Sequence, residues 1–341
     1  MKTGIIGASG YAGGELIRLL SNHPEFEMSY ISAGSNAGQK ITSVHPYLTG
    51  FKNQLFQATD TAAMNTCELL FLALPHGESA KIVEAIDPSV RIVDLGADYR
   101  LHSSQSWKRY YGGDHAGTWV YGLPELPGQR EKIAQATRVA NPGCYATSIA
   151  LAAAPAISAG LIDSSDIVVV ASSGTTGAGR SAKINLLGSE VMNSLTSYKF
   201  GGVHQHTPEI EESLSKLKNG DVKVSFTPIL APMPRGILAT VTAKISSSAN
   251  YSALRKAYES AYNDETFVTL LSEGEMPKTS SVLGSNAVHL QIALDEHTNR
   301  LIVSSAIDNL GKGAASQAIQ NANVMMGLPE GLSMSAMGIP S

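Results

Sequence analysis

Residues 2–16 have the sequence KTGIIGASGYAGGEL, in which an apolar run is followed by a glycine-rich turn. Thr3–Ile6 is predicted to be a strand and Ala12–Leu20 a helix. Between them, glycines recur at positions 7, 10 and 13 with the spacing G-x-x-G-x-x-G. Such a turn lets backbone amides approach the pyrophosphate of a dinucleotide at a helix N-terminus, although glycine-rich turns also serve plain strand–helix packing. The strand before the turn and the helix after it favour the dinucleotide interpretation.

Short apolar runs alternate with helical patterns through the first 140 residues, as in parallel βαβ units. Further strands are predicted at Glu27–Ile31, Glu68–Leu74, Val90–Leu95 and Arg138–Ala140, and a helix at Ser79–Ile86. This pattern predicts an α/β fold with a Rossmann-type, doubly wound parallel sheet.

The pattern changes after residue 144, where strands follow one another with fewer helices between them. Strands are predicted at Asp166–Ala171, Lys223–Thr227, Gly236–Ile245, Val288–Ala293 and Arg300–Ser305, and helices at Glu209–Lys216 and Ser252–Tyr262. We therefore predict an α+β second domain with an antiparallel or mixed sheet. The Ala- and Gln-rich segment Gly311–Met326 has helical spacing and is expected to pack back on the first domain, while Gly331–Ser341 is expected to be a loose tail.

The composition excludes several classes of protein. The 341 residues are enough for two domains with full cores, and 43% hydrophobic with 16% charged residues is an ordinary balance. A formal net charge of −4 without a Lys/Arg run argues against a nucleic-acid partner. No apolar run approaches the roughly 20 residues that span a bilayer, and no signal-peptide pattern opens the chain, so we expect a cytoplasmic protein. No cluster of Cys, His and carboxylate residues has metal-ligand spacing, so no metal is expected.

Cys144 is the most informative single residue. It lies in the stretch Asn-Pro-Gly-Cys-Tyr-Ala-Thr at positions 141–147. There the proline disfavours helical geometry at the residue before it and the glycine permits a sharp turn, so a small-residue helix is predicted to begin here. A thiol at a helix N-terminus meets unpaired N–H groups and the positive end of the dipole, which favour the thiolate. The other cysteine, Cys67, lies in a predicted strand, Cys67–Leu74, and is interpreted as inert core.

The end of the second predicted strand bears on the choice of cofactor. Sites for NAD usually have an acidic residue about 20 residues past the glycines, which binds the ribose 2′-OH. Residues 32–36 are Ser-Ala-Gly-Ser-Asn, so no carboxylate repels a 2′-phosphate, and Ser32 and Ser35 can donate hydrogen bonds to it. NADP is therefore favoured over NAD, although an arginine that would strengthen this choice is missing.

A nicotinamide cofactor and a nucleophilic cysteine together define a reaction class. The thiolate adds to an activated acyl group, and the resulting thioester accepts hydride to give an aldehyde. Such chemistry needs a proton donor, and His204 and His206 are the candidates. Because they lie two apart on a segment expected to be extended, both are predicted to face one cleft. Either histidine can instead be a buried hydrogen-bonding group, and the residues alone leave that alternative open.

An acyl phosphate also needs an anion site. Arg100 follows a predicted strand at the carboxyl edge where open α/β sheets bind ligands, with a salt bridge to Asp94 or Asp98 as the alternative. Ser172–Arg180 is a second loop rich in glycine and hydroxyl groups, suited to anions through its backbone N–H groups. Its terminal Arg180 favours a ligand over a merely flexible loop.

These motifs occur together in one known family. The glycine loop is followed in order by Asp94–Arg100, Asn141–Thr147, Ser173–Arg180, His204–Ile210 and Asp308–Gly313. Over nearly the whole chain this resembles the N-acetyl-γ-glutamyl-phosphate reductases of the semialdehyde dehydrogenase superfamily. The resemblance implies NADPH-dependent reduction of N-acetyl-L-glutamyl 5-phosphate to the 5-semialdehyde, in arginine biosynthesis, through a thioester on Cys144 and with release of phosphate. Gln205 stands where the family often has arginine, which removes one anion contact.

The resemblance also implies a role for individual residues. His204 is the expected acid or base, with His206 and Glu209 shaping the site. The expected substrate-binding residues are Arg100, Asn141 and Arg180, and the expected cofactor-binding residues are Gly7, Ser9, Gly10, Tyr11, Ala12, Ser32, Ser35, Ser173, Gly174, Gly177 and Asn309. Residues 1–143 are expected to bind NADP, with a helical segment at 308–330 returning to them. Residues 144–307 are expected to form a catalytic and oligomerisation domain of a homodimer or homotetramer.

Three other interpretations are less consistent with the residues. Aspartate-semialdehyde dehydrogenase has the same chemistry, but its cysteine pattern and its arginine–histidine helix find no match here. The lysine-pathway reductase acts on an aminoadipyl phosphate carried on a small protein, and one methylene of substrate is worth only about 1–3 kcal/mol of discrimination. A non-catalytic NADP-binding protein is disfavoured by the intact Cys144 and the histidine pair.

Overall fold

The computed structural model describes residues 1–218 and 220–339, and the chain forms two compact units. The first unit contains Met1–Pro124, Gly128–Pro142 and Ala314–Met334, and the second contains Glu125–Pro127, Gly143–Gly313 and the residues from Ser335 on. The chain therefore passes between the units more than once. Among the described residues, no helix has the length and apolar character needed to cross a membrane.

The first unit is built on a six-stranded sheet with the order β2-β1-β3-β4-β6-β5, in which every neighbouring pair is parallel. The strands are β1 (Lys2–Ile6), β2 (Glu27–Ser32), β3 (Leu69–Leu72), β4 (Arg91–Asp94), β5 (Val120–Tyr121) and β6 (Arg138–Ala140). Because β1 lies between β2 and β3, the sheet winds in both directions from β1. The prediction of a doubly wound parallel sheet is confirmed.

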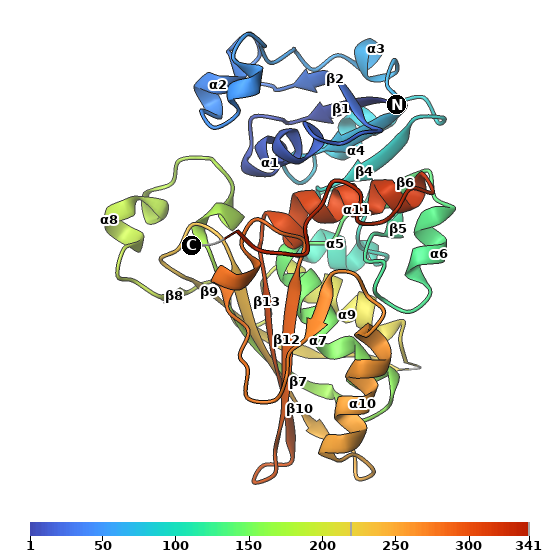
Figure 1. Ribbon diagram of the computed structural model, residues 1–341, viewed down its shortest axis with the longest axis vertical. Helices are drawn as coiled ribbons and strands as arrows, with labels where there is room; N and C mark the ends of the chain where they lie inside the picture. The colour runs from blue at the N-terminus through green and yellow to red at the C-terminus, as the bar shows by residue number, and fades with distance from the viewer. Residues whose placement is uncertain (219, 340–341) are drawn as a thin grey trace. The chain divides into compact units, whose positions relative to one another are not determined.

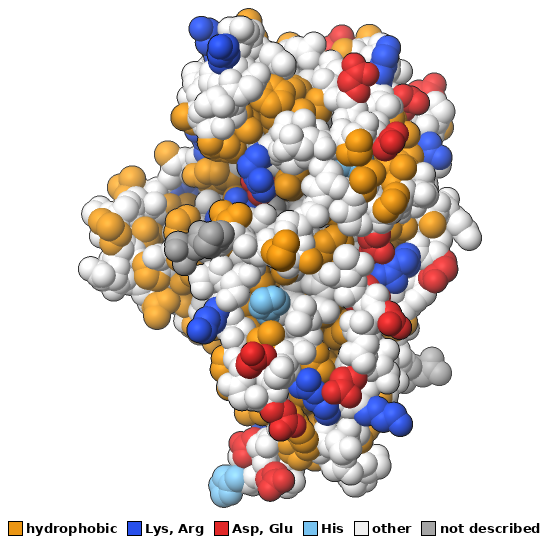
Figure 2. Space-filling view, viewed as in Figure 1, with side chains coloured by type: hydrophobic (Ala, Val, Ile, Leu, Met, Phe, Trp, Pro, Cys, Tyr) orange, Lys and Arg blue, Asp and Glu red, His pale blue; other side chains and the backbone are white. Residues whose placement is uncertain are grey.

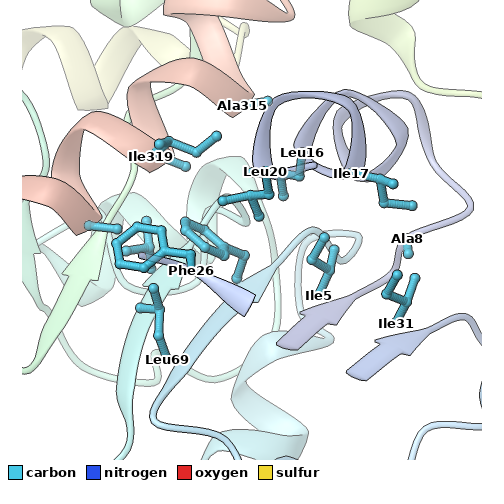
Figure 3. Packing of buried hydrophobic residues seen from close by; sticks show 14 of the residues in the cluster. Ile5, Ala8, Leu16, Ile17, Leu20, Phe26, Ile31, Leu69, Ala315 and Ile319 are labelled. Carbon is cyan, nitrogen blue, oxygen red and sulfur yellow. The ribbon is translucent and has the colours of Figure 1, made fainter. Parts of the chain in front are cut away.

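Both faces of this sheet are buried, which explains the apolar run of its central strand β3, Leu-Leu-Phe-Leu. Successive residues of β1 point to opposite faces, so Ile5 belongs to one hydrophobic cluster and Ile6 to the other. On the Ile5 side the sheet packs against α1 (Tyr11–Leu20) and α11 (Ser316–Met325), as Figure 3 shows. On the Ile6 side it packs against α4 (Ser79–Val83). The unit also contains α2 (Ile41–Val44), α3 (Thr61–Met64), α5 (Ser104–Tyr110) and α6 (Gln129–Ala134).

The second unit is built on a seven-stranded sheet with the order β11-β12-β13-β10-β7-β9-β8 (Figure 1). Its strands are β7 (Ile162–Ser173), β8 (Thr196–Ser197), β9 (Val224–Leu230), β10 (Ile237–Ile245), β11 (Val268–Leu270), β12 (Val288–Asp295) and β13 (Arg300–Ile307). The pairs β11–β12 and β7–β9 are parallel and the others antiparallel. The sheet is therefore mixed, as predicted.

One face of this mixed sheet is covered by helices. Figure 1 shows α7 (Cys144–Ser158), α9 (His206–Ser215) and α10 (Tyr251–Tyr262) on the same side of the strands. Two tyrosines tie α10 to α7: Tyr258 and Tyr262 donate hydrogen bonds of 2.6 Å to backbone carbonyls of that helix. A short helix, α8 (Gly188–Val191), lies in the connection between β7 and β8.

Three predicted local features need correction. Cys67 is buried, as expected, but it precedes β3, which begins at Leu69, and is not part of the strand. The C-terminal segment up to residue 339 is not loose, because the amides of Asn286 and Ile339 bond across it to Ser335 and Leu283; residues 340–341 lie outside the described part. The segment predicted as a helix from residue 311 begins with a π-helical turn, Gly311–Ala315.

Candidate active site

Cys144 is the first residue of α7, as predicted, and its side chain is partly exposed. The residue before it, Gly143, is extended and donates its N–H to Oε1 of Glu209 at 2.7 Å. Glu209 is buried on α9. A buried carboxylate thus satisfies one of the orphan amides at the helix start and holds the turn that presents the sulfur.

A second segment packs against the same cysteine. In the π-helical turn, a Cβ at Gly313 would lie 2.7 Å from the Cβ of Cys144, so only glycine fits there without a shift. The neighbouring Lys312 is fully buried and forms an ion pair with Glu125, while its Nζ lies 5.7 Å from the ring centroid of Phe267. This buried pair anchors the turn that abuts the nucleophile. The sequence offers no signal for it, because the two charges lie 187 residues apart.

His204 and His206 lie together, but not in the predicted way. The segment is not extended: Gln205 is helical and α9 begins at His206. The two rings nevertheless lie 4.9 Å apart, because Nδ1 of His204 accepts the N–H of His206 at 3.1 Å and folds the backbone back on the ring. Tyr145 contacts both rings edge-on, at 5.5 and 6.0 Å.

The two histidines differ in their surroundings. His204 is 6% exposed, and burial, followed by the neighbouring His206 and Lys199, lowers its pKa to about 2, against which Glu209 acts weakly. With Nδ1 accepting an amide and the pKa this low, the ring is neutral at any ordinary pH. His206, on the first turn of α9, is only partly buried. The histidine singled out by resemblance is therefore poorly suited to take up a proton.

Tyr198 was missed by the sequence analysis. Its hydroxyl donates to Oη of Tyr145 at 3.2 Å, and Tyr145 donates in turn to the carbonyl of Ile229 at 3.3 Å. Its ring also lies 5.8 Å from that of His204. Burial raises the pKa of Tyr198 to about 12, with a smaller effect from Cys144, so the phenol stays protonated. Tyr198 was missed because it follows a two-residue strand in an otherwise exposed connection.

The loop predicted to bind anions, Ser172–Arg180, is held by residues far along the chain. Ser173 is buried, and a Cβ at Gly174 would lie 2.7 Å from the backbone of Pro234. The side chain of Asn309 bonds twice, accepting from the amide of Gly236 at 2.7 Å and donating to Oγ1 of Thr176 at 3.0 Å. Asn309 thus fastens this loop, while Gly177 and Arg180 are exposed.

In the first unit, Arg100 and Asn141 form one buried arrangement. Arg100 is 6% exposed and donates from Nε to the carbonyl of Asn141 at 2.8 Å and from Nη2 to that of Leu95 at 2.7 Å. The amide of Asn141 is also in use, since Nδ2 donates to Ala314 and Oδ1 accepts from Asn321. These contacts brace the end of β6 just before the Pro-Gly-Cys turn.

The glycine loop has the shape that a dinucleotide requires. Gly7 has φ +81°, and a Cβ there would lie 2.4 Å from the carbonyl oxygen of Ala73, so no other residue fits. Gly10 is the extended N-cap of α1, and a Cβ at Gly13 would lie 2.6 Å from the Cα of Ala8. The loop therefore reaches the start of α1 through glycines at all three of these positions, a geometry that fits a pyrophosphate at the helix N-terminus. Ser9 and Ala12 are half-buried and Tyr11 is exposed.

The residues expected at the 2′-phosphate differ in accessibility. Ser32, the last residue of β2, is fully buried, whereas Ser35 is exposed and donates to Oδ1 of Asn36 at 3.4 Å. Asn36 donates in turn to Gln39 at 3.2 Å. The accessible hydroxyl at the end of β2 is therefore that of Ser35.

Comparison with known proteins gives consistent matches along the chain. Residues 2–136 match the family model described as semialdehyde dehydrogenase, NAD binding domain, and residues 144–309 match semialdehyde dehydrogenase, dimerisation domain. N-acetyl-gamma-glutamyl-phosphate reductase of Acidothermus cellulolyticus is 54% identical over 99% of this chain and 98% of its own. The protein of that name from Salinispora tropica is 54% identical over 99% of each chain.

Solved structures with the same fold are more distant in sequence. Aspartate semialdehyde dehydrogenase II from Vibrio cholerae, complexed with ASA, has a TM-score of 0.70 at 14% identity, covering 95% of this chain and 98% of its own. Aspartate semialdehyde dehydrogenase with NADP from Candida albicans has a TM-score of 0.69 at 16% identity, with the same coverage. These two likenesses concern the fold.

Proposed function

Because the chain belongs to the family of N-acetyl-gamma-glutamyl-phosphate reductases, we propose that it reduces N-acetyl-L-glutamyl 5-phosphate to the 5-semialdehyde with NADPH. The reaction releases phosphate and belongs to arginine biosynthesis. The observation that carries this proposal is the full-length identity with that family, combined with a partly exposed thiol at the start of α7.

The chain's own residues supply the covalent part of the reaction. The thiolate of Cys144, favoured by its place at a helix N-terminus, forms a bond to the acyl carbon while the bond from that carbon to the phosphate oxygen breaks. Phosphate leaves and a thioester remains on the sulfur. NADPH, when bound, supplies the hydride that reduces this acyl group. The sulfur–carbon bond then breaks, the aldehyde is released and the thiolate returns.

We assign the proton transfer to His206. The acyl oxygen takes up a proton when the hydride reduces the thioester, and it gives that proton up again as the carbonyl of the aldehyde forms and the thiolate leaves, so a side chain that can both donate and accept a proton is needed. His204 does not meet that condition, because it accepts the amide of His206 at Nδ1 and has a pKa of about 2. His204 instead positions His206, while Glu209 holds the turn before Cys144.

Substrate binding and cofactor binding are assigned to different residues. Arg180 supplies a positive charge for the leaving phosphate, and Arg100 and Asn141 shape the substrate site through the turn that they brace. The cofactor's pyrophosphate is assigned to the loop from Gly7 to Ala12, with Ser35 serving the 2′-phosphate. Ser173, Gly174, Gly177 and Asn309 complete the cofactor side through the second loop. Residues 1–143 with 308–330 are proposed as the NADP domain and 144–307 as the catalytic domain.

We further propose that the chain forms a homodimer or homotetramer through the uncovered face of the mixed sheet. On this face Val168 is 37% exposed, Val170 43% and Leu238 37%, an unusual exposure for β-branched and apolar residues at the centre of a sheet. Hydrophobic side chains also gather around α8, where Met192 and Leu195 are more than half exposed (Figure 2). The match of residues 144–309 to a dimerisation domain supports assembly through the second unit.

The assembly is tested by size-exclusion chromatography with light scattering. Val170→Lys should reduce the mass to that of one chain, because a buried charge is costly at an interface. The matched control is Ser165→Lys, which places the same charge at an exposed position elsewhere on β7. An unchanged mass for Val170→Lys would rule out this face. A nucleophilic thiol that is not part of a disulfide suits a reducing compartment, and we propose that the protein is cytoplasmic.

The reaction is tested in reverse. Phosphate, NADP⁺ and N-acetyl-L-glutamate 5-semialdehyde are mixed with the protein, and NADPH formation is followed by its absorbance. Turnover is expected with this aldehyde. A preference for the corresponding aminoadipate semialdehyde would overturn the arginine assignment in favour of the lysine-pathway reaction, and no turnover with either would leave a protein that only binds NADP.

Three variants test the roles of the residues. Cys144→Ser should abolish turnover while leaving NADPH affinity unchanged, since the glycine loop is untouched. His206→Asn should lower kcat by about 10²–10⁴, the range of general acid–base catalysis. His204→Asn keeps an oxygen acceptor where Nδ1 lies and should lose much less. If His204→Asn is the more damaging of the two with its fold intact, the proton assignment is wrong.

A further inference from the structure

Beneath the glycine loop of the first unit, a buried histidine contacts the backbone of the loop. His45 follows α2, is 1% exposed, and its Nε2 lies 2.9 Å from the carbonyl oxygen of Ala8. Because a carbonyl oxygen can only accept, Nε2 carries the proton and donates it. In the neutral ring Nδ1 is then an acceptor, and Tyr47 donates its hydroxyl to Nδ1 at 3.4 Å.

The helix that follows the loop leaves space for this ring at Gly14. A Cβ at Gly14 would lie 2.5 Å from Cε1 of His45 and 2.6 Å from Oη of Tyr47. Phe56 packs its ring edge-on to His45, with centroids 6.2 Å apart. Gly14 is therefore required by the side chains below the helix, a reason different from that for the three glycines of the G-x-x-G-x-x-G spacing.

The direction of the His45 hydrogen bond has a stereochemical consequence. The carbonyl of Ala8 and the N–H of Ser9 belong to one peptide group, and in a trans peptide these two bonds point in opposite directions. With the carbonyl turned down to the imidazole, the Ser9 N–H is turned to the opposite side of the loop. A rotation of this peptide would lose the hydrogen bond from His45 and aim the amide elsewhere.

We propose that His45, held by Tyr47, is a positioning residue of the cofactor site, which fixes the Ala8–Ser9 peptide so that the Ser9 amide donates to the dinucleotide pyrophosphate. The inference rests on the proposed use of NADPH. His45 itself does not touch the cofactor, and its effect passes through the backbone. It therefore strengthens binding without entering the chemical steps at Cys144.

Two isosteric variants test this positioning role. In His45→Gln, Nε of the amide can occupy the place of Nε2 and still donate to Ala8, whereas the shorter side chain of His45→Asn cannot reach it. His45→Asn should raise the Kd and the KM for NADPH about tenfold, the loss expected for one hydrogen bond to a charged group. At saturating NADPH its kcat should stay within about twofold of the wild type, and His45→Gln should recover most of the affinity.

Gly14→Ala provides an independent perturbation. Alanine favours a helix over glycine, so α1 should not be weakened, yet the methyl group must displace the imidazole. We expect the same tenfold loss of NADPH affinity as in His45→Asn. Wild-type affinity in folded His45→Asn and Gly14→Ala, or a loss of kcat without a change of KM, would overturn the proposal.

A measurement on the unmodified protein covers the case in which the variants do not fold. Long-range ¹H–¹⁵N spectra of the imidazole should show a neutral ring protonated at Nε2. A ring protonated at Nδ1 alone could not donate to Ala8 and would refute the inference. If the wild type shows the ring protonated at Nε2 but does not bind NADPH, the cofactor proposal fails while the hydrogen bond from His45 to Ala8 stands. The two failures are therefore distinguishable.

Discussion

A buried carboxyl group in the first unit makes the stability of the protein depend on pH in an unusual direction. Asp94, the last residue of β4, is fully buried. Its Oδ1 accepts hydrogen bonds of 2.8 Å from Ser79 and from the amide of Gly96, whereas Oδ2 has no hydrogen-bond partner in the described chain. Burial raises the pKa of Asp94 to about 7, and Asp98 adds to the rise, while the two hydrogen bonds and Arg100 oppose it.

The sign of the effect follows from proton linkage. The folded state holds the proton of Asp94 up to about pH 7, whereas the unfolded chain releases it near 3.8. Stability from this group is therefore fully present below pH 3.8 and is lost as the pH rises to about 7. At about 1.4 kcal/mol for each pH unit, the loss amounts to roughly 4 kcal/mol.

Asp94→Asn removes this dependence. Asparagine keeps an oxygen acceptor for Ser79 and Gly96 and places a neutral amide where the charge would be buried. We expect the variant to be more stable than the wild type at pH 8, by up to about 4 kcal/mol, and the difference to approach zero near pH 4. Urea denaturation from pH 4 to 8, followed by tryptophan fluorescence, measures it, since both tryptophans, Trp107 and Trp119, lie in the same unit.

Asp98→Asn is the matched control. Both oxygens of Asp98 accept backbone N–H groups, from Gly77 at 2.8 Å and Ala80 at 3.0 Å, so an amide there must turn a donor toward a donor. That variant should be destabilised at pH 8 by about 1–3 kcal/mol. The reasoning on Asp94 would be refuted by a difference between Asp94→Asn and wild type that does not change with pH, or by a less stable variant at pH 8.

Three further predictions concern the second unit. Lys312→Met leaves the Glu125 carboxylate buried without its cation and should lower the free energy of unfolding by about 3–5 kcal/mol, part of which the added change Glu125→Gln should restore in urea denaturation. Gly313→Ala places a methyl group 2.7 Å from the Cβ of Cys144, so both turnover and the rate of thiol alkylation by iodoacetamide should change while NADPH affinity does not. Tyr258→Phe removes a buried hydrogen bond of 2.6 Å to α7 and should cost about 1 kcal/mol in the same denaturation assay; no loss would mean that packing alone ties α10 to α7.

The fold and the start of α7 could be predicted because their signals are local. The glycine spacing, the apolar runs and the Pro-Gly-Cys turn each act within a few residues, and the chain forms β1, α1 and α7 where these signals predict them. The histidine pair shows the limit of such reasoning. A spacing of two residues predicts side chains on one side of an extended strand, but here the amide of His206 donates to His204 and the segment forms the first turn of a helix.

Contacts between distant segments were not predictable from the chain. Tyr198 joins the site through Tyr145, 53 residues away. Asn309, expected from the resemblance to contact the cofactor, has two protein partners for its side-chain amide, Gly236 and Thr176. No pattern along the chain marks such pairs, because each partner is an ordinary residue in its own local context.

The sequence by itself determined the class of the fold, the position of the glycine loop and the place of Cys144 at a helix start, since these follow from local backbone preferences and from the periodicity of apolar residues. Only the tertiary structure decided the protonation of the side chains around them. His204 is kept neutral and Asp94 keeps its proton to about pH 7 because both are buried among segments that the fold brings together. The cost of burying a charge depends on that surrounding, and the order of residues along the chain does not contain it.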